Sequence, residues 1–385
     1  MALYTYRFSD LLTDRDVAEL EVTNATFDRR IIVPGSFRGV VNVSNPEVGR
    51  AVRNVVPGRT VCHVYRDQEI WGSYIIWTMR VSSPQRGPVV VELNGASLES
   101  WLYRRLLDKN VQYNQLDQIT IARNLITIAQ TGWSPYSSSA NLGIELQTGS
   151  SGVLRDREYR IDEAATVGQR LEELANVDNG FEYMIHTYYD PASDSRRRLF
   201  KWGYPLLGNS SNVWSFQQPG NVLSFELSYD ANEGATAFWT RGDSIEDDLT
   251  NESIPIMTAS PTFANEYMNS GFPHIDKVID YSGVTSLLTL EQYAQWWRDN
   301  RGGIVLIPQI EVRASDDDYQ IMSPARVGEY ANIVIENVFF PLNADGSPSY
   351  SDNLRIVGIE VTASQRNEIE KHKLVVSQDF DPTGI

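Results

Sequence analysis

One pattern occurs twice in this sequence and limits the folds open to it: a strand whose apolar side chains change face at a glycine. In the first copy, Gly58 precedes an alternating strand, "TVCHVYR". The next strand changes phase at Gly72, because Ile70 lies on one face and Ile75 on the other. A phase change beside a glycine predicts a β-bulge, the irregularity that bends a sheet. The pattern therefore favours small, curved sheets.

The second copy begins at Gly328 and runs through "EYANIVIEN" and "NLRIVGIEVTAS", where the phase changes at Gly358. Segments 58–93 and 328–376 share one order: glycine, strand, loop, strand, phase-shifting glycine, strand, polar connector, strand. They share the pattern and not the residues. We interpret them as a structural duplication, and the alternative is two unrelated β units with the same rhythm.

The chain between the two copies has helical periodicity. Asp117 is a candidate N-cap for "ITIARNLITIAQ", and Thr166 with Gln169 forms a capping box before "VGQRLEELA". The strands "FEYMIHTYYD" and "SRRRLFKWGYP" then predict a hairpin. Two helices followed by a hairpin predict a small α/β unit over 109–220.

These elements predict a mixed, mainly β fold with two small β-barrel-like units and an inserted α/β unit. A later helix, "TLEQYAQWWRDN", is expected to begin at a capping box of Thr289 and Gln292. The expected division is a first β-barrel unit, an α/β insertion, return strands with an acidic segment, a helix plus second β-barrel unit, and a C-terminal tail (1–108, 109–220, 221–285, 286–378 and 379–385).

Charge and composition exclude several classes of protein. The net charge is −17, and residues 1–110 hold 14 basic and 12 acidic side chains, so the acidic excess lies beyond them. An acidic surface disfavours tight binding to phosphate backbones. No apolar run is long enough for a membrane helix, the start lacks a secretory signal pattern, and Cys62 alone cannot form an intrachain disulfide.

Few residues are candidates for chemistry. His274 with Asp276 and Asp280 could hold a metal, although a polar strand edge has the same pattern. Cys62 and His63 are adjacent, and neighbours on a strand point to opposite faces, so they cannot form a nucleophile pair. No GxSxG, HExxH, calcium loop or phosphate-binding glycine motif occurs. We assign no catalytic, cofactor-binding or metal-binding residue, and expect no enzyme activity.

Three surface motifs also have plain structural explanations. "TRGDS" (240–244) contains an adhesion tripeptide, but Gly-Asp after a strand predicts a turn. "SRRR" (195–198) predicts a solvated hairpin tip, or otherwise a contact for an acidic partner. Trp77, Trp101 and Trp297 lie on apolar stripes and favour core packing over sugar stacking.

The order of these elements resembles a known family. The block "GRTVCHVYRDQEIWGSYIIWTMRVSSPQRGPVVVELNGASLESWLYRRLL" is similar to the first barrel of minor tail proteins from long-tailed phages, especially phages of actinobacteria. "ITIARNLITIAQTG" and "ATVGQRLEELANVDNGFEYMI" resemble their α/β insertion, and "RVGEYANIVIEN" with "NLRIVGIEVTAS" resembles their second barrel. The resemblance covers roughly residues 1–376 and depends on order and spacing, not on an invariant motif.

The resemblance implies a phage tail-tip or baseplate hub in the virion, with no catalytic residue, metal or cofactor to transfer. It implies a homotrimer that contacts a hexameric distal tail protein ring, the tape-measure protein and downstream tip or receptor-binding proteins, and that lets DNA pass without specific binding. Two similar units in each of three chains would give six near-equivalent positions, which can match a sixfold tube.

Two other functions stay open at this point. Exposed aromatic side chains could bind a receptor or a carbohydrate, and the many carboxylates could include a cell-wall hydrolase pair. The C-terminal segment 379–385 is either a docking arm or disordered.

Overall fold

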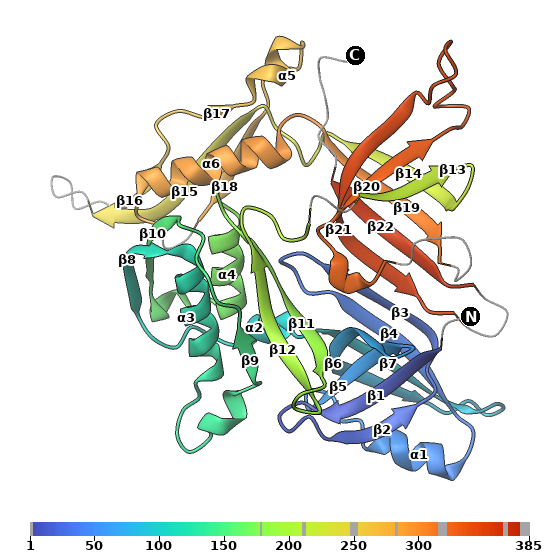
Figure 1. Cartoon of the computed structure of the whole chain (residues 1–385). Helices are drawn as coiled ribbons and strands as arrows, with labels where there is room; N and C mark the ends of the chain where they lie inside the picture. Colours follow the sequence, from blue (N-terminus) through green and yellow to red (C-terminus); the bar gives the residue numbers. More distant parts are fainter. Residues whose placement is uncertain are drawn as a thin grey trace.

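The computed structural model describes residues 3–177, 179–209, 213–246, 253–281, 284–314, 322–364 and 369–377. The chain is mainly β, with one large sheet and three smaller ones. Figure 1 shows the N-terminal part of the large sheet in blue to teal below its C-terminal part, which is yellow-green in β13 and β14 and otherwise orange to red, with the intervening segments beside them.

The N-terminal part of the large sheet, called here the first unit, has the strand order β2-β1-β5-β6-β7-β4-β3, and every neighbouring pair is antiparallel. Its strands are β1 (Tyr4–Asp10), β2 (Asp16–Leu20), β3 (Thr23–Arg30), β4 (Ser36–Val43), β5 (Thr60–Arg66), β6 (Glu69–Ser82) and β7 (Val89–Ser97). Helix α1 (Pro46–Arg53) follows β4, and the side chain of Asn45 caps it.

The C-terminal part, the second unit, has the order β14-β19-β22-β21-β20-β13. Its strands are β13 (Val213–Gln218), β14 (Val222–Asp230), β19 (Val305–Arg313), β20 (Tyr330–Ile335), β21 (Tyr350–Thr362) and β22 (Lys371–Ser377). All neighbours are antiparallel except β13 and β20. The order β5-β6-β7-β4-β3 in the first unit therefore matches β20-β21-β22-β19-β14 in the second, which confirms the predicted duplication.

Local geometry repeats as well. The N–H of Gly58 donates to the carbonyl of Ile76, and the N–H of Gly328 donates to the carbonyl of Ile356, both at 2.7 Å. Directly after each isoleucine, the pairing to the next strand shifts by one residue, at Trp77 in β6 and at Val357 in β21. The bulge predicted at Gly358 is therefore present, and β6 has an equivalent bulge at Trp77 that was not predicted.

The two phase-shifting glycines, however, are not equivalent. Gly358 follows the Val357 bulge on the β22 side, and its counterpart in the first unit is Thr78. Gly72 instead lies beside a separate bulge on the β5 side, where Trp71 is the extra residue. The sequence pattern therefore located a bulge beside each glycine, but these two bulges lie at different positions of the repeated unit.

The expected β-barrel-like units differ from the structure in one respect. Among the described residues no sheet closes, and the two units form one continuous sheet of 13 strands because β3 pairs with β21. The units also differ at one hairpin: β5 and β6 are joined by Asp67 and Gln68, whereas β20 and β21 are joined by 336–349, which carries the exposed side chains of Val338 and Phe339.

The inserted segment packs two helices between small sheets. It contains α2 (Glu99–Leu102), β8 (Val111–Asp117), α3 (Gln118–Gln130), β9 (Ile144–Leu146), β10 (Leu154–Tyr159), α4 (Val167–Ala175), β11 (Glu182–Asp190) and β12 (Ser195–Gly203), with 3₁₀ turns at Ser137–Ala140 and Ile161–Glu163. Asp117 caps α3, and Thr166 and Gln169 form the predicted capping box of α4. Strands β11 and β12 form the predicted hairpin, called here the central hairpin.

The segment between β14 and β19 forms a further small sheet. It consists of β15 (Ala237–Glu246), β16 (Ser253–Met257), β17 (Thr262–Phe263), α5 (Asn265–Asn269), β18 (Asp276–Asp280) and α6 (Leu287–Arg301), and a 3₁₀ turn, Pro324–Arg326, follows β19. The N-cap of α6 is Ser286, three residues before the expected Thr289. Because the hydroxyl of Thr240 in β15 donates to the carbonyl of Leu290, α6 belongs to this sheet and not to the second unit, where it was expected.

One expected boundary also moves. β13 lies within 109–220 but pairs with β20 of the large sheet, so the insertion ends before Val213. Two clusters of buried apolar side chains hold the fold together. One fills the large sheet, and the other joins α3, α4 and the central hairpin to β5 and β6 through Val61 and Ile75. Within the described segments, no helix has the length and apolar character needed to cross a membrane.

Candidate assembly interface

The junction between β3 and β21 is where the two units meet within one chain. Its pairs run from Gly358 opposite Arg30 to Thr362 opposite Thr26, in antiparallel register. Val361 and Phe27 lie opposite one another and are 0% and 1% exposed. On this face, the β3–β21 junction buries side chains as completely as the interior of either unit.

The long strands β6 and β21 occupy the same position in the two units. The first half of each pairs with the preceding strand, β5 or β20, and the second half pairs with the following strand, β7 or β22. In the second unit, the second half of β21 also pairs with β3 on its other edge. In the first unit, the corresponding half of β6 (78–82) pairs only with β7 among the described strands. The first unit therefore has a free edge at the place where the second unit forms the β3–β21 junction.

The counterpart of β3 is also an edge. In the first unit, Thr78 pairs with a residue of β7, that residue pairs with one of β4, and this one pairs with Thr26 in β3. In the second unit, the same three steps lead from Gly358 through β22 and β19 to Glu226 in β14. Strand β14 therefore corresponds to β3, and Leu227 corresponds to Phe27. Within the described part of the chain, β14 pairs only with β19 and ends the sheet.

The two free edges carry apolar side chains at positions that the β3–β21 junction buries. Val81 corresponds to Val361 and is 59% exposed, and Leu227 corresponds to the buried Phe27 and is only partly buried. Exposed strand edges with apolar side chains are rare unless another chain pairs with them. Each unit thus has one free edge at a position that corresponds to one half of the β3–β21 junction.

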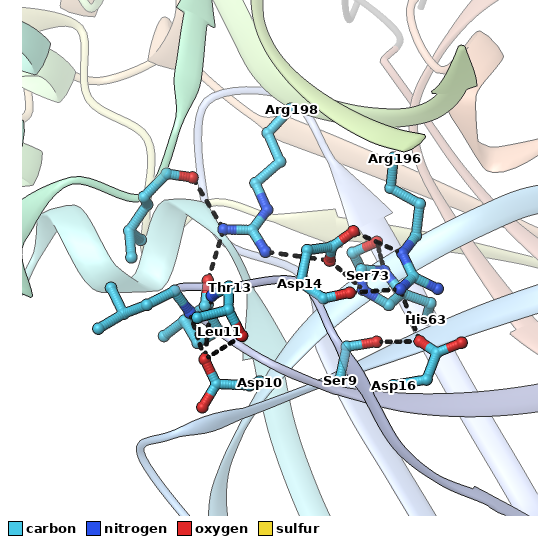
Figure 2. A network of polar contacts seen from close by, with 12 residues as sticks. Ser9, Asp10, Leu11, Thr13, Asp14, Asp16, His63, Ser73, Arg196 and Arg198 are labelled. Atoms are coloured by element: carbon cyan, nitrogen blue, oxygen red, sulfur yellow. Dashed lines mark hydrogen bonds and ion pairs between the residues drawn. The ribbon is translucent and has the colours of Figure 1, made fainter. Parts of the chain in front are cut away.

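A partly buried polar network holds the central hairpin against the first unit (Figure 2). Arg196 donates from Nε to Asp14 Oδ2 at 2.8 Å and from Nη2 to Asp16 Oδ1 at 2.6 Å. Arg198 donates to the backbone carbonyls of Leu11 and Leu142, both at 2.8 Å, and its Nη2 lies 3.4 Å from Asp14 Oδ1.

This network corrects the expectation for "SRRR". The run is not a solvated hairpin tip, because Arg198 is buried and Arg196 is nearly so. Only Arg197, which pairs with Glu145, is substantially exposed. Two of the three arginines are therefore engaged inside the chain.

Ser73, His63 and Asp14 stand in the order of a hydrolase triad. His63 Nδ1 lies 2.7 Å from Ser73 Oγ, and His63 Nε2 lies 3.3 Å from Asp14 Oδ1. Ser73 and His63 are both buried in the sheet, and the neighbouring surface cavity, lined by Asp14, Tyr65 and Arg196, includes neither of them. A substrate carbonyl therefore has no route to the serine, and the contacts serve packing.

Burial and charge set the ionisation of this cluster. Burial lowers the pKa of His63 to about 4, which outweighs the nearby Asp14 carboxylate, so the imidazole is neutral at pH 7. Burial opposes ionisation of Asp14, but His63 and Arg196 outweigh it and hold its pKa below the usual value. Cys62 points away from His63 into the apolar cluster, as the strand period predicts.

The other sequence candidates do not form a reactive site. His274 Nε2 contacts Asp276 Oδ1 at 3.1 Å, but Asp280 pairs with Arg241, and no group of three potential metal ligands occurs among the described residues. The "TRGDS" motif lies within β15 and not in the expected turn. The three tryptophans expected in the core are buried or partly buried: Trp77, Trp101 and Trp297.

Comparison with known proteins gives a clear result only for structures. No family model matches the sequence, and no curated protein matches it. A tail protein from Neisseria meningitidis MC58 is 14% identical, with 98% of each chain covered and a TM-score of 0.57. The 43 kDa tail protein of prophage MuSo2 from Shewanella oneidensis is 11% identical, again with 98% of each chain covered and a TM-score of 0.57.

The chain shares the fold of these two tail proteins. The match extends over nearly the full length of both solved tail proteins, so it includes both units and the segments between them. The expected fold class is confirmed, and the resemblance stated from the sequence is confirmed at the level of the fold.

Proposed function

We propose that this protein is a hub at the distal end of a phage tail, where three copies close into a ring that joins a sixfold tail tube to threefold tip components. The tail-protein fold and the duplicated unit support this proposal. Its location would be the tail tip of the virion. Its neighbours would be a distal tail protein ring, the tape-measure protein and downstream tip or receptor-binding proteins.

The observation that carries the proposal is the pair of free edges. Placing β14 of the partner subunit against β6, in the register of the β3–β21 junction, sets Val81 opposite Leu227 of the partner subunit. Met79 would then face Tyr229 of the partner subunit, and Arg80 would lie diagonal to Glu226 of the partner subunit. Apolar pairs opposite one another and opposite charges on the diagonal both stabilise sheet pairing.

This contact is heterologous, since it joins the first unit of one chain to the second unit of the next. Heterologous contacts close into rings when the rotation between copies permits it. Because the contact within a chain and the contact between chains would use the same strand pairing, three copies would present six similar units around the ring. A ring of this kind would match six subunits of a tube on one side and threefold components on the other.

The acidic charge supports a passage for DNA without binding. The net charge is −17, and the excess carboxylates lie beyond the first 110 residues. A wall with this charge repels phosphate backbones. We expect no retention of double-stranded DNA by the purified protein in filter binding at low salt, where electrostatic attraction would be strongest. Retention there would contradict this part of the proposal.

Disulfide trapping tests the ring directly. In a protein carrying Val81→Cys and Leu227→Cys, oxidation should link neighbouring copies in purified protein or in assembled tails, and the covalent ladder should stop at three chains. The native Cys62 is fully buried, so it should add little background. A matched control replaces Leu227→Cys by Leu154→Cys, because Leu154 is an exposed leucine on β10, away from both edges. A ladder that stops at two chains or continues past three, or equal linking in the control, would contradict the proposal.

One observation favours a second function, binding of a receptor glycan. Trp133 and Tyr136 are 71% and 75% exposed in one loop, and Trp133 Nε1 donates to Asp108 Oδ2 at 2.7 Å. Exposed aromatic faces beside a carboxylate are suited to sugar stacking. Glycan-array binding that is lost in Trp133→Ala would support adhesion. Clearing of peptidoglycan in a zymogram would instead indicate a hydrolase, which the structural role does not require.

A further inference from the structure

A cavity of about 160 Å³ lies apart from both free edges, between the insertion and α6. One wall comes from β8, β10 and α4, through Arg157, Tyr159 and Arg170. The opposite wall comes from the start of α6, through Ser286 and Thr289. The cavity therefore joins two segments that are far apart in the sequence.

The insertion wall holds several buried hydrogen-bond donors without partners. Nε and Nη2 of Arg157, Oη of Tyr159 and Nε of Arg170 are inaccessible to solvent and have no hydrogen-bond acceptor among the described residues. Tyr159 is 4% exposed and Arg170 is 2% exposed. Nearly all buried polar groups in proteins have a partner, so a cluster of unpaired donors around a cavity indicates a bound acceptor.

Of the two guanidiniums at the cavity, Arg157 is the one that could pair with an anion. Arg170 is neutralised by Glu163 and by Glu173, which accepts from its Nη1 at 2.7 Å. Arg157 instead makes one hydrogen bond, from Nη1 to the backbone carbonyl of Asp156, and forms no ion pair within the described part of the chain. The carboxylates near the cavity outnumber its two guanidiniums, so an anion would be held by the hydrogen bonds of Arg157 and not by a net positive charge.

The carboxylates that line the cavity do not fill this role. Asp156 accepts hydrogen bonds from the backbone and side-chain amides of Gln115, both at 2.7 Å, and Glu158 is exposed. On the other wall, α6 is 15 residues long and directs its N-terminal end at the cavity. The partial positive charge of a helix N-terminus adds to that of Arg157.

We propose that this cavity binds a small free oxyanion of the phosphate class, with the guanidinium of Arg157 and the hydroxyl of Tyr159 as donors and the start of α6 facing it. A planar guanidinium offers two parallel N–H groups to such an oxyanion. The donors lie on β10, and the partial positive charge of the α6 N-terminus lies on the opposite wall. A bound anion would therefore connect the β15–β18 sheet and its helix to the insertion. The site is independent of the ring proposed above.

Thermal unfolding with increasing inorganic phosphate, at ionic strength kept constant with sodium chloride, tests the site. A ligand that binds only the folded state raises the melting temperature progressively with its concentration. Phosphate also stabilises proteins non-specifically, so the decisive result is the difference between variants. We expect Arg157→Gln to lose the specific part of the rise and Tyr159→Phe to weaken phosphate binding several-fold. Arg160→Gln is the control and should behave as the wild type, because Arg160 is exposed and paired with Asp162.

Line broadening in ³¹P NMR provides a second measurement that does not depend on stability. Broadening of the phosphate signal by wild type and Arg160→Gln, but not by Arg157→Gln, would support the proposal. Should Arg157→Gln fail to fold, the same comparison with Tyr159→Phe decides. An equal response from every variant would mean an adventitious ion only. A response to acetate and not to phosphate would show a carboxylate site and overturn the assignment.

Discussion

Arg355 and Glu182 form a two-point ion pair that joins the second unit to the central hairpin. Nη1 of Arg355 donates to Oε1 of Glu182 at 2.7 Å, and Nη2 donates to Oε2. The same guanidinium donates to the backbone carbonyls of Gly328 and Leu207 at 3.0 and 2.7 Å. One side chain thus satisfies acceptors from three separate segments.

Arg355→Lys should be poorly tolerated although it keeps the charge. An ammonium group cannot reproduce the planar fork, so at least one buried acceptor loses its donor. We expect the free energy of unfolding to fall by about 2 kcal/mol, measured by urea denaturation. Arg313→Lys, at an exposed position of β19, is the control and should change little. Equal losses in the two variants would show that the fork geometry is unimportant.

The two glycines that begin the repeated pattern should respond differently to alanine. Gly58 has a φ of 79° and Gly328 a φ of 103°, so both substitutions strain the backbone. A Cβ at Gly58 would meet open space, whereas a Cβ at Gly328 would lie 2.3 Å from the carbonyl oxygen of Leu207. We expect Gly58→Ala to cost about 1 kcal/mol and Gly328→Ala about 3 kcal/mol or more. Similar denaturation midpoints for the two variants would contradict this prediction.

Asp14→Asn should loosen the central hairpin from the first unit. The substitution leaves Arg196 and Arg198 without their shared carboxylate in a largely buried setting. Removing one partner of a buried ion pair costs about 3 kcal/mol. Hydrogen exchange should increase first in β12, the strand that carries both arginines. Asp162→Asn, which removes an exposed ion pair with Arg160, should leave exchange in β12 unchanged, and equal effects of the two variants would argue against the network.

Stability should fall as the pH drops from 7 to 5. Burial lowers the pKa of His63, and likewise of His186, to about 4 in the folded chain, against about 6.5 when unfolded. Between these values the unfolded chain binds more protons, so acid favours unfolding, and each histidine contributes about 2 kcal/mol. Urea titrations at several pH values should show a shallower dependence for His63→Gln. An unchanged slope in that variant would contradict the assignment.

The features that sequence could predict are those decided by neighbouring residues. The bulges follow from a phase change within a single strand, and the caps at Asp117 and Thr166 follow from side chains that reach their own helix. The cap of α6 was misplaced because Ser286 and Thr289 are both suitable acceptors three residues apart. In the structure the hydroxyl of Ser286 accepts from the backbone N–H of Thr289, so the helix begins before Thr289.

Contacts between distant segments left no such signal. A strand with one apolar face has the same alternation of residues whether its edge pairs with another strand or faces solvent. The β3–β21 junction and the open sheet therefore could not be predicted. The run "SRRR" is equally compatible with a solvated tip and with buried ion pairs, because Asp14 lies far away in the sequence. The unpaired donors at Arg157 and Tyr159 likewise depend on α6, which the fold brings from a later segment.

The unequal hairpins have a consequence for any ring built from this chain. One unit closes its hairpin with Asp67 and Gln68, and the other extends through 336–349 to Val338 and Phe339. Around six units, long and short hairpins would alternate, so one face of the ring would carry three projecting loops with apolar side chains. In a sixfold neighbour, only every second subunit would meet a projecting loop. A trimeric neighbour could bind all three loops through identical contacts.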